Sequence, residues 1–145
     1  MAVTVNFYDN FIQDIGLQRM NLATDTFKVM LVNGYVFNKG HNSKVNISGE
    51  LGTADGYTAG GIALNQSWTV DGSSITKFDA DDVSWTVTPS GTIGPCTGAV
   101  IYDDTVTSPT ADRLMCYIDF GGAESTGPST EFKIIFDSNG LFTIG

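Results

Sequence analysis

The sequence is poor in the residue types on which most active sites and transition-metal sites depend. It has one histidine, His41, and two cysteines, Cys96 and Cys116. Catalysis by a serine–histidine or cysteine–histidine pair needs a base next to the nucleophile, but His41 lies in a Gly- and Asn-rich segment and the chain has no nucleophile-elbow pattern. The cysteines are too few for a disulfide framework and lack the paired short spacings of a zinc site. We therefore expect a protein that is not an enzyme, holds no metal or other cofactor and has two free thiols.

Basic residues and long apolar runs are scarce as well. Seven Lys and Arg residues stand against sixteen Asp and Glu residues, for a formal net charge of −9. Nucleic-acid binding draws much of its affinity from Lys and Arg side chains that displace counterions from phosphates. The basic residues here are isolated from one another: Arg19, Lys28, Lys39, Lys44, Lys77, Arg113 and Lys133. Because no apolar run reaches membrane-spanning length and no signal-peptide pattern is present, we expect a soluble chain made in the cytoplasm, with neither nucleic-acid nor membrane partners.

Glycine and short apolar runs are abundant. The chain has 145 residues, of which 41% are hydrophobic and 11% aromatic, which is enough apolar surface for one packed domain over residues 1–145. Seventeen glycines and many Thr, Ser, Asn and Asp residues separate the apolar runs, a pattern typical of strands joined by turns. We therefore predict a mostly β fold, an antiparallel β-sandwich or barrel-like domain with one short N-terminal helix.

The helix is predicted over about residues 6–16. Large apolar residues recur there at helical spacing on one face: Phe7, Tyr8, Phe11, Ile12 and Ile15. Asn6 could cap its first turn and Gly16 could end it. The apolar face would normally pack on the core of the same domain, although a helix at a chain end could equally pack against a neighbouring subunit.

A buried strand and a long irregular segment follow the helix. The run 26–32 alternates Phe27, Val29 and Leu31 with a second face that is also largely apolar, which predicts a central strand. Residues 33–61 contain seven glycines and no sustained periodicity, and we expect at most a short helical turn near residues 45–51. A segment of this length is usually functional or partly ordered by a partner.

Antiparallel strands are predicted within residues 62–145. Short apolar runs occupy residues 62–70, 75–78, 83–87, 99–102, 114–120, 132–136 and 141–144. Asp71, Gly72 and Ser73 form a turn signal between the first two runs. Val83, Trp85 and Val87 alternate with hydroxyl-bearing residues, so Trp85 should point into the core. Residues 137–140 resemble a tight hairpin turn, which predicts that the last two strands pair with each other.

The densest acidic group consists of Asp79, Asp81 and Asp82, with Asp103 and Asp104 as further candidates. Carboxylates suit a hard cation such as Ca²⁺, but the spacing lacks the glycine and the closing acid of a calcium loop. The same residues could supply a carboxylate pair for glycoside hydrolysis, although nearly any acidic domain offers such pairs. We favour solvated turns that protect strand edges and keep cation binding as the alternative.

Three aromatic residues lie in the irregular segment rather than on a strand: Tyr35, Phe37 and Tyr57. Exposed aromatic rings could form a platform for a sugar. Large aromatic residues in a long loop more often hold it against the core, and we favour that interpretation.

Five segments carry a resemblance to a known family. They are residues 57–61 (YTAGG), 78–85 (FDADDVSW), 99–104 (AVIYDD), 118–122 (IDFGG) and 136–142 (FDSNGLF). In this combination and order the chain resembles a group of small structural proteins of tailed phages. The resemblance implies a virion component and carries over no catalytic residue. It does not distinguish a capsid decoration protein from a neck, collar or tail component.

Within these segments, six residues are expected to have structural roles: Tyr57, Gly60, Gly61, Trp85, Tyr102 and Asp103. Tyr57 can anchor the return of the irregular segment, the two glycines permit positive φ angles or close packing at a sharp turn, and Trp85 can fill the core.

Three functions follow from the sequence, in order of preference. The first is a decoration or cement subunit on the outer capsid surface, assembled as a homo-oligomer with other virion proteins as partners; a trimer would suit local three-fold sites. The second is a neck, collar or tail component, including a spike- or fibre-associated module that binds host carbohydrate through residues 33–61. The third is a hydrolase that uses Asp79 or Asp103.

Overall fold

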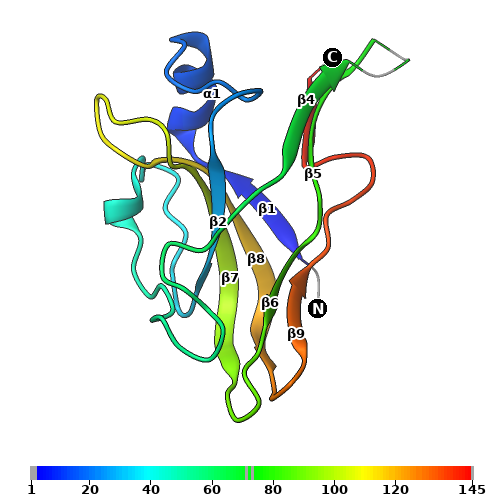
Figure 1. The fold of residues 1–145 in the computed structure, drawn as a ribbon. Coiled ribbons are helices and arrows are strands. Elements are labelled where there is room, and N and C mark those ends of the chain that lie inside the picture. The colour runs from blue at the N-terminus through cyan, green and yellow to red at the C-terminus, as the bar shows by residue number, and fades with distance from the viewer. Residues whose placement is uncertain (1–2, 71, 73, 145) are drawn as a thin grey trace.

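The computed structural model describes residues 3–70, 72 and 74–144, and it is mostly β, with 44% strand and 8% helix (Figure 1). In chain order the elements are β1 (Thr4–Phe7), α1 (Asp9–Gly16), β2 (Phe27–Val32), the 3₁₀ helix η1 (Lys44–Asn46), β3 (Ile62–Ala63), β4 (Gln66–Val70), β5 (Thr76–Ala80), β6 (Val83–Thr86), β7 (Ile93–Asp103), β8 (Arg113–Thr126), β9 (Glu131–Ile134) and β10 (Phe142–Ile144). The predicted fold class is therefore confirmed. Asp71 and Ser73 of the predicted turn lie outside the described residues.

The larger sheet has five antiparallel strands in the order β1-β8-β7-β2-β3. As predicted, residues 26–32 supply a strand with neighbours on both sides, and five of the six β2 residues are buried. Phe27, Val29 and Leu31 point into the main core, whereas Met30 and Val32 belong to a second cluster of buried residues beneath the irregular segment. Because both faces of the sheet are covered here, a nearly continuous apolar run fits this strand.

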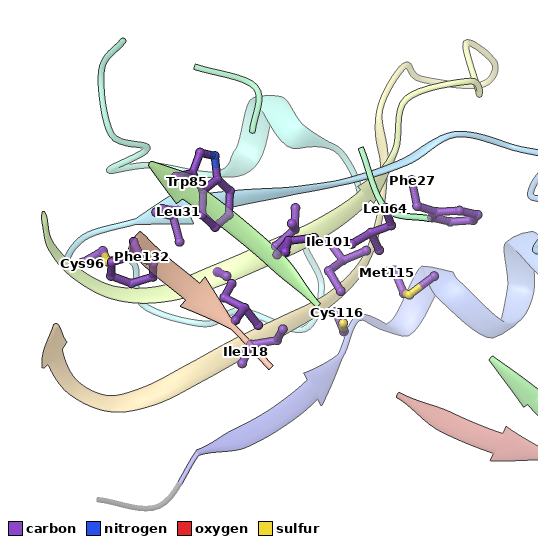
Figure 2. Packing of buried hydrophobic residues seen from close by; sticks show 14 of the residues in the cluster. Phe27, Leu31, Leu64, Trp85, Cys96, Ile101, Met115, Cys116, Ile118 and Phe132 are labelled. Carbon is purple, nitrogen blue, oxygen red and sulfur yellow. The ribbon is translucent and has the colours of Figure 1, made fainter. Parts of the chain in front are cut away.

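Two shorter sheets form the opposite layer, with the orders β10-β5-β4 and β6-β9. β5 leads into β6 across two residues, and β9 continues through residues 135–141 to β10 (Figure 1). The main core lies between this layer and the five-stranded sheet: Trp85 of β6 and Phe132 of β9 face Ile101 and Ile118 of the larger sheet (Figure 2). The arrangement is a sandwich with one continuous layer and one divided layer.

The helix begins later than predicted. Residues 4–7 form β1, which pairs with β8 in the register Val5↔Ile118 and Phe7↔Cys116, so the prediction of a helix from residue 6 is wrong at its start. Asn6 is a strand residue and not a cap. A short apolar run fits both helical and strand spacing, and backbone pairing with β8 decides between them. Neither α1 nor any other helix in the described part of the chain is long and apolar enough to cross a membrane.

The predicted pairing of the last two strands is also wrong. Residues 137–140 do form a turn, in which the Gly140 N–H donates to the Asp137 carbonyl oxygen at 2.8 Å. The flanking strands nevertheless belong to different sheets, because β9 pairs with β6 and β10 pairs with β5. The residues between β9 and β10 carry the chain from one half of the divided layer to the other, and local turn chemistry does not reveal this.

The irregular segment 33–61 is confirmed. Its helical content is η1, slightly earlier and shorter than the turn expected near residues 45–51. A bridge between Val32 and Glu50 holds the segment against the end of β2.

Candidate binding groove

A groove of about 640 Å³ opens along one edge of the sandwich, between the five-stranded sheet and β9. Its lining is chiefly apolar and includes Val5, Ile118, Phe120, Ile134, Phe136 and Leu141. The volume lies within the range of about 300–1,000 Å³ typical of ligand pockets. We term it the β1–β9 groove.

The groove reaches from solvent to the main core. Ile118 and Ile134 in its lining are buried members of the core. Val3, Val5 and Ile135 also line the groove, yet they are 60%, 47% and 74% exposed. Large apolar side chains exposed together beside an opening to the core are typical of an interaction surface.

β1 forms the edge of the larger sheet beside this groove. It pairs with β8, and no strand in residues 3–70, 72 and 74–144 pairs with its other side. Residues 3–7 are Val, Thr, Val, Asn and Phe, without a charge or a proline. Exposed edge strands are usually protected against pairing by charges, prolines or bulges. β1 has none of these, so its outer edge is open to an added strand.

β9 and the far part of β8 leave further backbone unpaired at the groove. Among the described strands, β6 is the sole partner of β9. β1 covers only residues 116–119 of β8. Pairing of β8 with β7 is interrupted between Asp119 and Glu124, where Gly121 has φ +76°. Irregularities of this kind occur preferentially at sheet edges and binding sites.

The rim of the groove is negatively charged. Glu124, Glu131 and Asp137 lie along it, all exposed, against a single cation, Lys133. The apolar interior and acidic rim together suit a ligand that is apolar in the middle and positively charged at its ends.

Four of the residues predicted to be structural lie elsewhere, around Glu50. The Tyr57 hydroxyl donates to Glu50 Oε1 at 3.1 Å and accepts from the Leu31 N–H at 3.1 Å. The Gly60 N–H also donates to Glu50, and the Tyr102 hydroxyl donates to the Gly60 carbonyl oxygen at 2.6 Å. These bonds fasten the end of the irregular segment to β2 and β7. The anchoring role of Tyr57 is confirmed, while that of Glu50 is new from the structure.

The two glycines and Trp85 have the expected geometry. Gly60 and Gly61 have φ angles of +97° and +80°, and a Cβ on Gly61 would overlap the carbonyl oxygen of Val29. Trp85 is only 5% exposed, and its ring centroid lies 5.8 Å from that of Tyr57. These residues hold the fold together and do not line the β1–β9 groove.

Asp103 is fully buried at the end of β7. Its Oδ1 accepts the N–H groups of Thr105 and Val106 at 2.8 and 3.3 Å. Burial, followed by a hydrogen bond with the Asp25 carboxyl group, raises the pKa of Asp103 to about 7. The side chain therefore closes a turn, and the second carboxylate of the hydrolase hypothesis, Asp79, lies on β5 in the other layer.

The predicted cation ligands have separate partners. Asp79 forms an ion pair of 3.1 Å with the lysine two residues earlier on β5. Asp81 Oδ2 accepts from Asn65 Nδ2 at 2.6 Å, and Asp82 Oδ1 accepts from the Phe136 N–H at 2.9 Å. Within the described ranges, no three His, Cys, Asp or Glu residues are grouped so that they could hold a metal ion. The structure thus contradicts a cation site at Asp79, Asp81 and Asp82, whose carboxylates are directed to different local contacts.

The aromatic residues of the irregular segment do not form an exposed platform. Tyr35 and Tyr57 are buried, and half-buried Phe37 stacks on Tyr117 with ring centroids 6.0 Å apart. His41 Nδ1 lies 2.8 Å from the Tyr35 hydroxyl. The prediction that these rings hold the loop against the core is confirmed.

Both cysteines are free and buried, as predicted. Burial raises the pKa of Cys116 to about 12, and burial together with the nearby Glu124 raises the pKa of Cys96 to about 12. Both thiols are therefore protonated at neutral pH, the form that is a poor nucleophile and a poor metal ligand.

The β1–β9 groove is not among the features that we predict from the sequence. One signal for it is present: residues 3–7 alternate apolar and polar side chains with a period of two, the pattern of a half-buried strand. The strand partners and the open edges depend on contacts between distant parts of the chain. Comparisons with protein-family models, with curated proteins and with solved structures found no match to this chain.

Proposed function

We propose that the protein is a non-enzymatic structural subunit of a tailed-phage particle and that it acts by contact with other virion proteins. The observation that carries this proposal is the β1–β9 groove, in which an uncharged, unpaired strand edge lies beside an apolar opening to the core. Such an edge is a template for pairing with another chain. The phage context comes from the resemblance of the five sequence segments.

Within the particle, we favour a decoration or cement subunit on the outer surface of the head. Its charge suits a position away from the genome, because five of the seven basic side chains lie within ion-pair distance of an aspartate: Arg19, Lys28, Lys39, Lys77 and Arg113. Those cations are at least partly neutralised and form no patch for phosphates. A symmetric homo-oligomer, such as a trimer at local three-fold sites, would match the symmetry of a capsid.

Quantitative mass spectrometry of purified particles tests this function. We expect the protein to be present in numbers comparable with those of the major capsid protein. A small fixed number of copies per particle would instead favour a neck, collar or tail component. Absence from purified particles would contradict a virion role altogether.

A further inference from the structure

We propose that the β1–β9 groove receives an extended segment of a different protein, which adds a strand to the outer edge of β1. The segment places apolar side chains in the groove and basic residues against its rim. The inference deepens the proposed function and rests on it, since it specifies the chemistry of the partner that the subunit contacts.

Backbone geometry sets the extended form of the partner. β1 is the terminal strand of its sheet and offers unpaired N–H and C=O groups along residues 4–7. A strand added at an open edge satisfies these groups, and main-chain hydrogen bonds supply much of the affinity in this mode of recognition. The added strand would extend the sheet from five strands to six without a change in the rest of the fold.

The lining sets the side chains of the partner. Successive residues of a strand point to opposite faces of the sheet, so every second residue of the added strand would point into the groove. There it would meet Val5, Ile118 and Ile134. Burial of a polar group without a hydrogen bond is unfavourable in such a lining. The inward residues are therefore apolar, and they would cover Val5 and Ile135, which are 47% and 74% exposed in the free protein.

Charge complementarity selects a basic partner rather than a second copy of this chain. The rim carries Glu124, Glu131 and Asp137 against Lys133, and the whole chain has a formal net charge of −9. Two copies joined at this edge would bring two acidic rims together, which opposes association. Lys or Arg residues at the ends of an inserted segment would be attracted to the same rim.

Synthetic peptides test the proposal with the purified protein. The first probe is a peptide of alternating valine and threonine with two lysines at each end, the second replaces the lysines with glutamates, and the third has proline at the central threonine positions. Isothermal titration calorimetry should show that the lysine peptide binds at least about tenfold more tightly than either of the others. Hydrogen exchange at residues 4–7 should slow when it binds. Equal affinity of the lysine and proline peptides would overturn strand addition, and equal affinity of the lysine and glutamate peptides would overturn the basic partner.

Substitutions in the protein locate the site. Val5→Lys puts a charge in the groove and should abolish binding, whereas Val45→Lys, at a residue 87% exposed outside the groove lining, should leave it unchanged. Glu131→Lys should weaken binding of the lysine peptide and strengthen that of the glutamate peptide. Unchanged binding by both Val5→Lys and Glu131→Lys would overturn the site.

Two further outcomes separate this inference from the proposed function. Self-association through β1, seen as a dimer in sedimentation that Val5→Lys dissociates, would overturn the choice of a different protein as the occupant. A protein that is abundant in purified particles but binds none of the peptides would overturn the inference and leave the proposed function standing.

Discussion

Asp14 of α1 and Arg113 of β8 form a buried two-point ion pair. Arg113 Nε donates to Asp14 Oδ2 at 2.8 Å and Nη2 donates to Oδ1 at 3.1 Å, although the residues are 99 positions apart in the sequence. Asn10 Nδ2 donates both to Asp14 Oδ2 at 2.7 Å and to the Leu114 carbonyl oxygen at 3.0 Å. The helix is thus fixed to the strand that also pairs with β1.

Removal of this carboxylate should be strongly destabilising. Asp14→Ala leaves the buried guanidinium of Arg113 without its main partner, and we expect the free energy of unfolding to fall by about 3–5 kcal/mol. Asp104→Ala is the matched control, because Asp104 pairs with Lys28 at 3.0 Å at the surface and should contribute about 0–1 kcal/mol. Urea unfolding of the three proteins measures the difference. Similar losses in both variants would show that burial does not strengthen the pair.

The same pair should contribute to stability at acid pH. Burial opposes ionisation of Asp14, but hydrogen bonds from Arg113, Asn10 and Arg19 together with the charge of Arg113 outweigh it and hold the pKa below its ordinary value of 3.8. The contribution is therefore complete above about pH 4 and is lost as the pH falls through the lowered pKa. In unfolding experiments, the difference between wild type and Asp14→Ala should be constant from pH 5 to 7 and should shrink below pH 4.

Gly60 and Gly61 separate backbone strain from steric overlap. Both have positive φ, but the nearest atom to a Cβ on Gly60 would lie 3.7 Å away, whereas a Cβ on Gly61 would overlap the Val29 carbonyl oxygen. Gly60→Ala should cost about 1–2 kcal/mol from its left-handed conformation. Gly61→Ala should cost about 1–3 kcal/mol more, because β2 must move away. Equal melting temperatures for the two variants would contradict this close approach to β2.

Asp103 should make the fold less stable as the pH rises. Its pKa of about 7 lies above the ordinary value of 3.8, so the folded state binds this proton more tightly than the unfolded state. Stability from this group is complete below about pH 4 and is lost as the pH rises to 7. Asp103→Asn keeps the acceptor for Thr105 and Val106 and carries no charge. The decrease in melting temperature between pH 5 and pH 8 should be smaller in Asp103→Asn than in wild type, and an equal decrease would contradict the raised pKa.

Trp85 and Ile135 distinguish a core residue from an interface residue. Trp85 is 5% exposed, and Trp85→Ala should lower the free energy of unfolding by about 3–5 kcal/mol. Ile135 is 74% exposed in the groove lining, and Ile135→Ala should change the stability by no more than about 0.5 kcal/mol. Binding of the lysine peptide should nevertheless weaken in Ile135→Ala. A large loss of stability in that variant would indicate that Ile135 belongs to the core.

Sequence patterns predicted the parts of the structure that depend on local periodicity. The alternation around Trp85 predicted its burial, and the doubly apolar run from Phe27 predicted a strand covered on both faces. Residues 4–7 and the strand partners of β9 were missed because an apolar run and a turn do not specify which distant strand offers a free edge. The groove was missed for the same reason, since it exists only where the edge of one sheet meets the edge of another.

Electron cryomicroscopy of tailed-phage particles purified from the source of the chain tests the central claim most directly. The account predicts this subunit on the particle, with an extended segment of another virion protein hydrogen-bonded to β1 and with apolar side chains in the β1–β9 groove. Particles that lack the subunit, or that contain it with the groove open and its contacts made elsewhere, would contradict the account.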